Sequence, residues 1–525
     1  MIKKENITRP LWFASILGLG IILFSLSFPG YFNEDGIPLL SFLTIIPVYY
    51  AIGKMNYRES MVYGFFYGTA NYLLFNYWLK GFDPISFSVA PTILGSYHII
   101  LFLGIKYIFN NFKRLQYIPL TLIWLAYEVF KGKNIIGYTY GTIAHTMYRT
   151  NYFTGIADIT GTYILSLIII FPGILIVSSI HSKIKLWSKK LLPPIIVYLF
   201  ILISAIIYTN VNKIDYSHSP TLRVSLIQHN LDCWLKGSNE LYKEALDNLL
   251  RLSSEAELLN PDLVIWSESA FVPAIEWHKK YKKNYFRLKL VKRLERFIAQ
   301  SNADYLIGTN ETIGEFEDDQ IRYNTVYHYI KELAIEKYRK EMLVPFTEQF
   351  PYPELFPALY HHTINLGANH YLPGKEQTLF TIKNIKTTQL ICYEDSFSRL
   401  ARTGINNGAN LIINMTNDAW SIEPACTKQH LAAATFRSIE NRRSFVRVGT
   451  GGYTCVIDPN GKILDSIPIL TQSQLTYDVP IINNKNSFYT KNGPIIEKIL
   501  LYIFAIIIFY SFIMSIHRVL LSKRK

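Results

Sequence analysis

Three short segments of this sequence each set one reactive side chain in a distinctive context. Glu268 lies in Trp-Ser-Glu-Ser, Lys340 precedes Glu-Met-Leu-Val-Pro-Phe, and Cys392 precedes Tyr-Glu-Asp. A thiol with an ordinary pKa of ~8.5 is mostly protonated at neutral pH and needs a base or a nearby cation. A carboxylate can take the thiol proton, and an ammonium can stabilise the thiolate and a tetrahedral oxyanion. The three residue types therefore predict covalent acyl chemistry, with Cys392 as nucleophile, Glu268 as base and Lys340 as electrostatic stabiliser.

Three further residues are expected to support this triad. A buried lysine without an anionic partner would be very costly, so we expect Glu348 to position Lys340 or to share its charge. Tyr393 and Glu394 directly follow the nucleophile, which closes an apolar, strand-like run. A strand that ends in a sharp turn can present a nucleophile at the rim of a sheet. An isolated strand cysteine is more often a small core residue, and the other two segments favour the catalytic interpretation.

The elements that must position these side chains lie in a block of mixed polarity between residues 213 and 494. Short β-type runs alternate there with helix-period segments at 240–259, 286–299 and 430–441. Strands and helices of this size predict sheets covered by helices, in an α/β or α+β fold.

Long apolar runs fill residues 11–208 and return at 499–516. About eight of them approach the roughly 17–25 residues needed to cross a ~30 Å hydrocarbon core. We expect spans near 11–28, 37–53, 61–79, 91–109, 117–130, 161–180, 191–208 and 499–516. The predicted domains are a membrane domain of about seven helices at 1–212, a catalytic domain at 213–494, and a C-terminal helix with a basic tail at 495–525.

The distribution of basic residues predicts the orientation of these spans. With the amino terminus inside, the inside loops hold most of the lysines and arginines of the membrane part. Seven crossings before residue 213 then place the large domain outside and return the carboxyl terminus to the cytoplasm. Loss of the fifth span, which is short and contains Glu128, would invert this domain. The net charge of +14 is attributed to these topology signals and not to a nucleic-acid partner.

Neither the cysteines nor the histidines form a metal-binding pattern. The four cysteines include no Cys-x-x-Cys pair, and a nucleophilic Cys392 must stay free. The others are expected to be reduced or buried, with one bridge among them left open: Cys233, Cys426 and Cys455. The histidines that suggest a metal site lack ligand spacing and a partner carboxylate: His361, His362 and His370. We therefore expect no metal and no cofactor.

One segment of the block, residues 350–360, is unusually aromatic. It holds three prolines and a single charged side chain, Glu354. The prolines predict an irregular loop, and so many aromatic side chains in a loop need an apolar partner. One interpretation is an arm that enters the outer leaflet and guides acyl chains to the nucleophile through Phe350, Phe356 and Leu359. The alternative, a loop packed on its own domain, stays open.

The three reactive segments together resemble the Glu-Lys-Cys triad of the nitrilase superfamily. Within it, the sequence is similar to the bacterial apolipoprotein N-acyltransferase branch, over the full length by topology and in sequence detail from 222 to 464. Further matching pieces are Tyr323-Asn324, the segment from Thr416 to Trp420, His430 and Arg437. The sequence departs from the family's proline, glycine and phenylalanine at Ser267, Thr347 and Ser421.

This resemblance implies a multi-span α-helical membrane domain plus a nitrilase-like α/β domain, an αββα sandwich. Cys392 would take an acyl chain from a phospholipid as a thioester, and the α-amine of an S-diacylglyceryl cysteine at a lipoprotein's amino terminus would receive it. Glu268 would deprotonate the thiol and then the amine, whose pKa of ~8 makes the transfer easy near neutral pH. Trp234 and Trp420 match family tryptophans and are expected at the substrate pocket. We expect a monomer in the bacterial inner membrane, with its catalytic domain on the periplasmic side.

Two rival functions remain open from the sequence. A membrane-anchored amidase or nitrile hydrolase could use the same triad with water as acceptor, although such chemistry needs little membrane sequence. A transporter or scaffold that has lost catalysis is disfavoured by the low charge within the predicted spans. Amide product instead of free fatty acid argues against the first rival, and acylation of Cys392 argues against the second.

Overall fold

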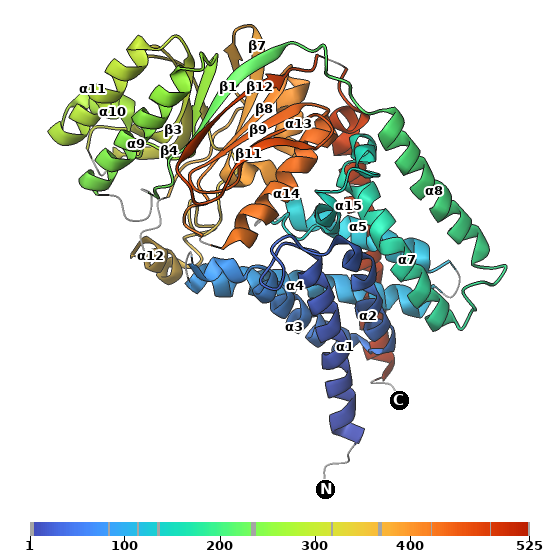
Figure 1. Cartoon of the computed structure of the whole chain (residues 1–525). Helices are drawn as coiled ribbons and strands as arrows, with labels where there is room; N and C mark the ends of the chain where they lie inside the picture. The colour runs from blue at the N-terminus through green and yellow to red at the C-terminus, as the bar shows by residue number, and fades with distance from the viewer. Residues whose placement is uncertain are drawn as a thin grey trace. The chain divides into compact units, whose positions relative to one another are not determined.

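Two units make up the chain, one of helices and one of strands and helices (Figure 1). The computed structural model describes residues 5–81, 84–112, 115–133, 137–232, 238–316, 319–365, 370–421, 423–483 and 485–522. The helical unit comprises 1–212, 423–432 and 492–525, and the α/β unit comprises 213–422 and 433–491.

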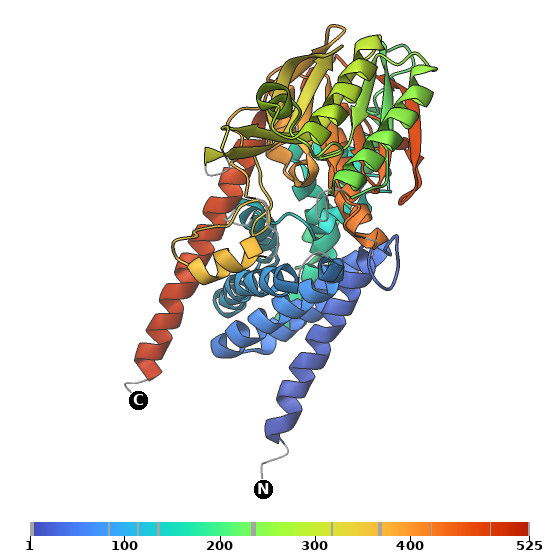
Figure 2. The same cartoon turned by 90° about the vertical axis from the view of Figure 1, so that its left-hand side faces the viewer.

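The helical unit contains the long apolar helices. Within the described residues, five stretches are long and apolar enough to cross a membrane: Thr8–Ser27, Phe87–Asn111, Thr162–Ser182, Leu192–Val211 and Phe488–Met514. They lie in α1 (Glu5–Ser27), α4 (Pro84–Asn111), α7 (Thr162–Ser182), α8 (Leu192–Val211) and α15 (Phe488–Ser522). The start of α1 and the end of α15 lie at the same end of this unit in both views (Figures 1 and 2).

The other three predicted spans are helical as well. They form α2 (Ser41–Lys54), α3 (Tyr57–Phe75) and α5 (Tyr117–Lys133). None of them meets the same criteria of length and apolar composition. The total of eight spans therefore stays a prediction.

Glu128, in the shortest predicted span, is buried but well paired. Its carboxylate accepts hydrogen bonds from Trp124 Nε1 (3.2 Å), the Ile143 amide (2.9 Å) and Ser166 Oγ (2.7 Å). A buried carboxylate without such donors would be very costly. The three donors come from α5, from the short 3₁₀ helix Ile143–Met147 and from α7, so this acid holds these parts of the helical unit together.

Two six-stranded sheets form the α/β unit, in the orders β12-β1-β2-β3-β4-β5 and β11-β10-β9-β8-β7-β6. The strands of the first sheet are β1 (Thr221–Gln228), β2 (Leu263–Trp266), β3 (Asp304–Ile313), β4 (Ile321–Ile330), β5 (Leu333–Arg339) and β12 (Ser473–Pro480). Those of the second are β6 (Leu379–Ile382), β7 (Ile385–Ile391), β8 (Leu411–Thr416), β9 (Ser444–Gly449), β10 (Thr454–Ile457) and β11 (Ile463–Ile467). In each sheet three consecutive strands run parallel, β1-β2-β3 and β7-β8-β9.

Helices cover the sheets on their outer faces (Figure 1). The first sheet carries α9 (Asn239–Glu257), α10 (Ile275–Tyr281) and α11 (Tyr285–Gln300), and the second carries α13 (Ser398–Asn406) and the latter part of α14 (Pro424–Asn441). One apolar cluster joins helix residues such as Leu246 and Leu294 to Tyr305 of the first sheet. Another fills the space between the sheets, with Ile265 facing residues such as Ile413. The αββα sandwich implied by the resemblance is confirmed.

Because both faces are covered, β2 and β8 are buried along their whole length. Every residue of β2 and of β8 is buried. Runs of apolar residues such as β2 are typical of parallel strands that are buried on two sides. Ligands of open α/β sheets bind outside the carboxyl ends of such strands.

Candidate active site

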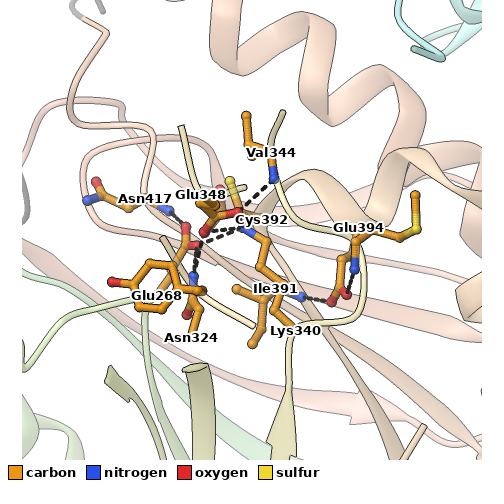
Figure 3. A network of polar contacts seen from close by, with 12 residues as sticks. Glu268, Asn324, Lys340, Val344, Glu348, Ile391, Cys392, Glu394 and Asn417 are labelled. Carbon is orange, nitrogen blue, oxygen red and sulfur yellow. Dashed lines mark hydrogen bonds and ion pairs between the residues drawn. The ribbon is translucent and has the colours of Figure 1, made fainter. Parts of the chain in front are cut away.

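The three predicted catalytic residues lie just beyond the ends of three strands. Glu268 follows β2 by two residues, Lys340 directly follows β5, and Cys392 directly follows β7. Figure 3 shows all three at one cluster of polar contacts. Strands of both sheets therefore contribute to this site.

Lys340 forms the centre of the cluster. Its Nζ lies 3.2 Å from Glu268 Oε1 and 2.8 Å from Glu348 Oε2, and the lysine side chain is only 1% exposed. Burial lowers the pKa of Lys340, but the charges of Glu268 and Glu348 outweigh burial and hold this pKa well above its usual value. Lys340 therefore stays an ammonium at neutral pH. The predicted partnership of Lys340 with Glu348 is present.

Asn324 joins the two carboxylates on a second side. Its Nδ2 donates to Glu268 Oε1 (2.8 Å) and to Glu348 Oε1 (2.9 Å). Glu268 also accepts from the Asn417 amide (2.9 Å), and Glu348 accepts from the Val344 amide (2.9 Å). Both carboxylates are therefore fixed in orientation. Sequence reasoning matched Asn324 and Asn417 to the family but did not assign either to the site.

The backbone around Glu268 passes close to the neighbouring strand. A Cβ on Gly308 of β3 would lie 2.2 Å from the Ser267 carbonyl oxygen, so only glycine fits there. Ser267, which replaces the family's proline, hydrogen bonds through its hydroxyl to Thr450 Oγ1 at 2.8 Å. This serine therefore has a polar role of its own in the turn that carries Glu268.

Cys392 adopts a backbone conformation that is unusual for a residue with a side chain. Its φ angle is +51°, and a short 3₁₀ turn, Cys392–Ser396, begins at this residue. Left-handed backbone in residues other than glycine is strained and is found at functional sites, including nucleophiles at strand ends. Asn414 Nδ2 donates to the Cys392 carbonyl (3.0 Å) and helps to hold this turn. The thiol-bearing residue is partly exposed, whereas Glu268 and Lys340 are buried.

Opposing influences act on the Cys392 thiol. Burial raises its pKa, the Glu268 charge raises it further, and the Lys340 charge lowers it. A hydrogen bond with Thr416 also lowers this pKa, but the net result lies well above the usual value. The resting thiol is therefore protonated, and it would need a base to act as a nucleophile.

Glu394 connects the two chain segments that carry Lys340 and Cys392. Its carboxylate accepts from Tyr338 Oη (2.9 Å), from the amides of Glu341 (2.7 Å) and Met342 (3.0 Å), and from the Ile391 amide (2.7 Å). Burial raises the pKa of Glu394 to about 7, although the backbone donors oppose this. Glu394 therefore positions both segments. Its neighbour Tyr393 is buried and packs edge-on against Phe397.

A buried arginine that the sequence did not single out lies beneath the turn. Arg447 of β9 is fully buried and donates to Asn414 Oδ1 (2.8 Å) and Asp418 Oδ2 (2.8 Å). It also forms an ion pair with Asp395. These contacts join the segment after Cys392 to the ends of β8 and β9. Nothing in the local sequence of β9 distinguishes this arginine from an exposed one.

The predicted substrate-binding tryptophans are in different situations. Trp234 lies outside the described residues. Trp420 is partly exposed, four residues beyond the end of β8.

Ser421, which replaces the family's phenylalanine, is buried and donates its amide to the Asp418 carbonyl (3.1 Å). Thr347 causes no strain in its turn, because the positive φ of +67° falls on Phe346.

The aromatic segment is more regular than predicted. The prolines predicted an irregular loop, and this prediction is wrong from Pro357 onward, where α12 (Pro357–Asn365) begins. Proline fits the first position of a helix, because that amide has no partner within the helix. Phe350 is 5% exposed and packs on Phe346 and Tyr360, whereas Phe356 is 57% exposed and Leu359 is partly exposed.

The remaining cysteines and histidines show no metal cluster within the described ranges. Among the described residues, Cys392, Cys426 and Cys455 form no disulfide bond, and the last two are buried. Cys233 lies outside the described residues.

Comparisons with known proteins agree with the two-unit architecture. The family model for the apolipoprotein N-acyltransferase N-terminal domain matches residues 12–175, and that for carbon-nitrogen hydrolase matches residues 223–480. Apolipoprotein N-acyltransferase 1 of Treponema denticola is 31% identical over 487 residues, covering 88% of this chain and 89% of its own. Its counterpart in Treponema pallidum is 29% identical over 499 residues, covering 90% and 91%. A solved amidase of the nitrilase superfamily from Nesterenkonia is 16% identical, covering 50% of this chain and 92% of its own with a TM-score of 0.37.

Proposed function

Because the chain belongs to the apolipoprotein N-acyltransferase family, we propose that it acylates lipoproteins in two steps on Cys392. The observation that carries this assignment is the buried ion cluster beside a partly exposed cysteine with a positive φ. The donor is a phospholipid, and the acceptor is the α-amine of an S-diacylglyceryl cysteine at a lipoprotein's amino terminus.

In the first step the thiol attacks an ester carbonyl of the phospholipid. Glu268 takes the thiol proton as the carbon–sulfur bond forms, and the ammonium of Lys340 stabilises the negative oxygen of the tetrahedral intermediate. The intermediate collapses by breaking the ester carbon–oxygen bond. Glu268 returns the proton to the glycerol oxygen, which leaves as lysophospholipid, and a Cys392 thioester remains.

In the second step the acceptor amine attacks the thioester. Glu268 accepts a proton from the amine, and Lys340 again stabilises the oxyanion. The carbon–sulfur bond breaks, the proton returns to sulfur, and an amide is released. An amide is more stable than the starting ester, so no cofactor has to supply energy. Glu348 keeps Lys340 oriented through both steps, and Asn324 keeps Glu268 oriented.

Mass spectrometry of the full-length protein tests both steps. After exposure to phospholipid, Cys392 should carry one added acyl mass, and Cys392→Ala should carry none. A diacylglyceryl-cysteine peptide should then remove this mass and appear as its N-acyl amide. Free fatty acid in place of the amide would favour a hydrolase, and an unmodified Cys392 would reject the mechanism.

We further propose that the chain is a monomer in the bacterial inner membrane, with the α/β unit on the extracytoplasmic side. The apolar helices and the basic loops predicted to lie inside support this orientation. A cysteine introduced at exposed Lys289 of α11 should react with a membrane-impermeant maleimide in intact spheroplasts. Labelling only after lysis would reverse the orientation.

A further inference from the structure

A cavity of about 490 Å³ in the α/β unit has a positively charged wall. Among the described residues that line it, Lys283, Arg287 and Arg322 are basic and Glu315 is the one carboxylate. Lys283 pairs with Glu315 at 3.1 Å. Among the described residues, the two arginines have no carboxylate partner, so their charge is available to a ligand.

The pairing of β3 with β4 connects this cavity to the active site. Asn310 and Thr312, both in the cavity wall, pair with Asn324 and Arg322. Directly paired residues of antiparallel strands share one face, with Cβ atoms about 5 Å apart. Two residues of strand span about 7 Å, so Arg322 lies about that far along β4 from Asn324, whose amide holds Glu268.

Tyr371 provides a second connection between cavity and site. Its ring lines the cavity, and its hydroxyl donates to Asn310 Oδ1 at 2.9 Å. Its backbone amide donates to the Glu348 carbonyl at 2.8 Å. The cavity wall is therefore fixed to the same loop that supplies a carboxylate to Lys340.

The groups in the wall suit a phosphate ester. Arg287 lies over the Tyr242 ring at 5.3 Å and donates through Nε to Asn239 (3.3 Å), which restrains its guanidinium. Arginine presents paired donors that match phosphate oxygens better than lysine does.

His278 adds a neutral polar group to the same wall. It is 4% exposed, and its Nδ1 has no hydrogen-bond partner among the described residues. Burial, and then the Arg287 charge, lower the pKa of His278 to about 4. This imidazole is therefore neutral at physiological pH and can exchange a hydrogen bond with a hydroxyl group without repelling a cation.

We propose that this cavity binds the phosphodiester headgroup of the acyl donor, with Arg287 and Arg322 on the phosphate oxygens and His278 on a headgroup hydroxyl. The inference rests on the proposed function, because that reaction requires a phospholipid. In a glycerophospholipid one glycerol unit joins the phosphate to the ester, which keeps the two within a few bonds. The spacing between Arg322 and the Asn324–Glu268 contact fits such a fixed separation. An acidic side chain of the acceptor has no comparable fixed distance from its reacting amine.

Two donors with the same acyl chains test the proposal. Full-length protein in detergent is mixed with phosphatidylglycerol or with the corresponding diacylglycerol, which has the ester but no phosphate. The rate at which Cys392 gains an acyl mass is then measured. R287Q/R322Q should slow acylation by phosphatidylglycerol by about 100-fold, since two charge-assisted contacts are lost, and should leave the slower diacylglycerol reaction nearly unchanged. Lys289→Gln removes an exposed charge from the same helix and should leave both rates unchanged.

Competition by glycerol 3-phosphate, a water-soluble fragment of the phospholipid, gives an independent measurement. Glycerol 3-phosphate should compete with phosphatidylglycerol in the wild type and lose this effect in R287Q/R322Q. Competition by glycerol 3-phosphate without any change in the variant's use of phospholipid would indicate a free phosphate site and overturn the proposal.

Other outcomes separate this inference from the proposed function. Equal slowing with both donors, or no slowing with either, would overturn the headgroup site while leaving the thioester mechanism intact. The headgroup site would also be overturned if R287Q/R322Q acylated Cys392 normally but used the lipoprotein peptide less well, because the cavity would then bind the acceptor. Absence of any acyl adduct in the wild type would reject the proposed function and this inference with it.

Discussion

Burial and the charges of Glu268 and Lys340 together set the protonation state of the Cys392 thiol. Burial has the largest effect and raises the thiol pKa, the Glu268 charge raises this pKa further, and the Lys340 charge lowers it, so the proton stays on sulfur in the resting site. In the proposed mechanism Glu268, which Asn324 orients, takes that proton once an acyl carbonyl is bound. A resting thiol also protects the enzyme, because a thiolate would react with oxidants.

Alkylation of Cys392 by iodoacetamide should respond in opposite directions to loss of the two partner charges. Lys340→Met removes an influence that lowers the thiol pKa, so the reaction at pH 8 should become slower. Glu268→Gln removes one that raises the pKa, so the reaction should become faster even though acyl transfer falls by about 10²–10⁴-fold. The pH profile of alkylation, read by mass spectrometry, measures both effects. Changes of the same sign would contradict this account of the cluster.

At the scale of single elements, strand ends and the turns that follow them do the positioning. The neighbouring strands β3, β4 and β5 are held together by a buried histidine as well as by backbone pairing. His328 of β4 lies between Asp304 of β3 (3.0 Å) and Glu336 of β5 (2.8 Å). Since β5 leads directly into Lys340, this contact supports the site from a distance.

The His328 contact predicts a pH dependence of stability. Burial lowers the pKa of His328, but Asp304 and Glu336 outweigh it and raise this pKa above its usual value. The stabilisation is therefore complete below the unfolded value of ~6.5 and is lost as pH rises through the folded value. Thermal denaturation between pH 6 and 9 should show a falling melting temperature in the wild type and a flatter profile in His328→Gln. Parallel profiles would refute this role.

The segment around α12 carries a second prediction. Tyr352, Leu355 and Phe356 are exposed there, and an arm in the outer leaflet requires exposed apolar side chains. Replacing these three by serine should weaken turnover of phospholipid in vesicles and leave the melting temperature nearly unchanged. Phe350→Ser is the matched control, because loss of a buried ring costs about 3–5 kcal/mol and should lower stability first. Unchanged turnover by the triple variant would favour a loop packed on its own domain.

At the scale of the whole chain, the division into two units does not follow the order of the sequence. Residues 423–432, the start of α14, group with the helical unit, although the chain before and after them belongs to the α/β unit. Gln429 is buried in this segment and donates to the carbonyls of Pro29 (2.7 Å) and Phe75 (3.2 Å), while Trp78 Nε1 donates to its side-chain oxygen (3.1 Å). One amide thus satisfies three groups of the helical unit.

Loss of Gln429 should therefore destabilise the protein far more than loss of its neighbour. Gln429→Met leaves buried polar groups without partners, each costing about 1–3 kcal/mol. Lys428→Met removes only ion pairs with the exposed side chains of Glu34 and Asp35, where about 0–1 kcal/mol is typical. Thermal denaturation in detergent compares the two variants. Similar melting temperatures would show that the Gln429 contacts carry little of the stability.

Local sequence was sufficient for the parts of this protein whose signal is carried by neighbouring residues. Apolar helices can be recognised from their composition, and five of the predicted spans are long and apolar enough to cross a membrane. Glu268, Lys340 and Cys392 each sit in a short motif, because a reactive side chain at a strand end needs a characteristic turn. The αββα sandwich also followed, through the resemblance that those motifs carried.

Only the tertiary structure decided which groups hold the reactive side chains in place. Asn324 and Asn417 lie 56 and 149 residues from the Glu268 carboxylate they orient, and Arg447 lies 52 residues from Asp395. Phe350 and Phe356 are the same residue type and lie in the same aromatic segment, yet Phe350 is buried and Phe356 is exposed. Strand pairing and packing bring distant residues together, and the hydrogen-bond partners and burial that result are properties of the folded chain that no local pattern encodes.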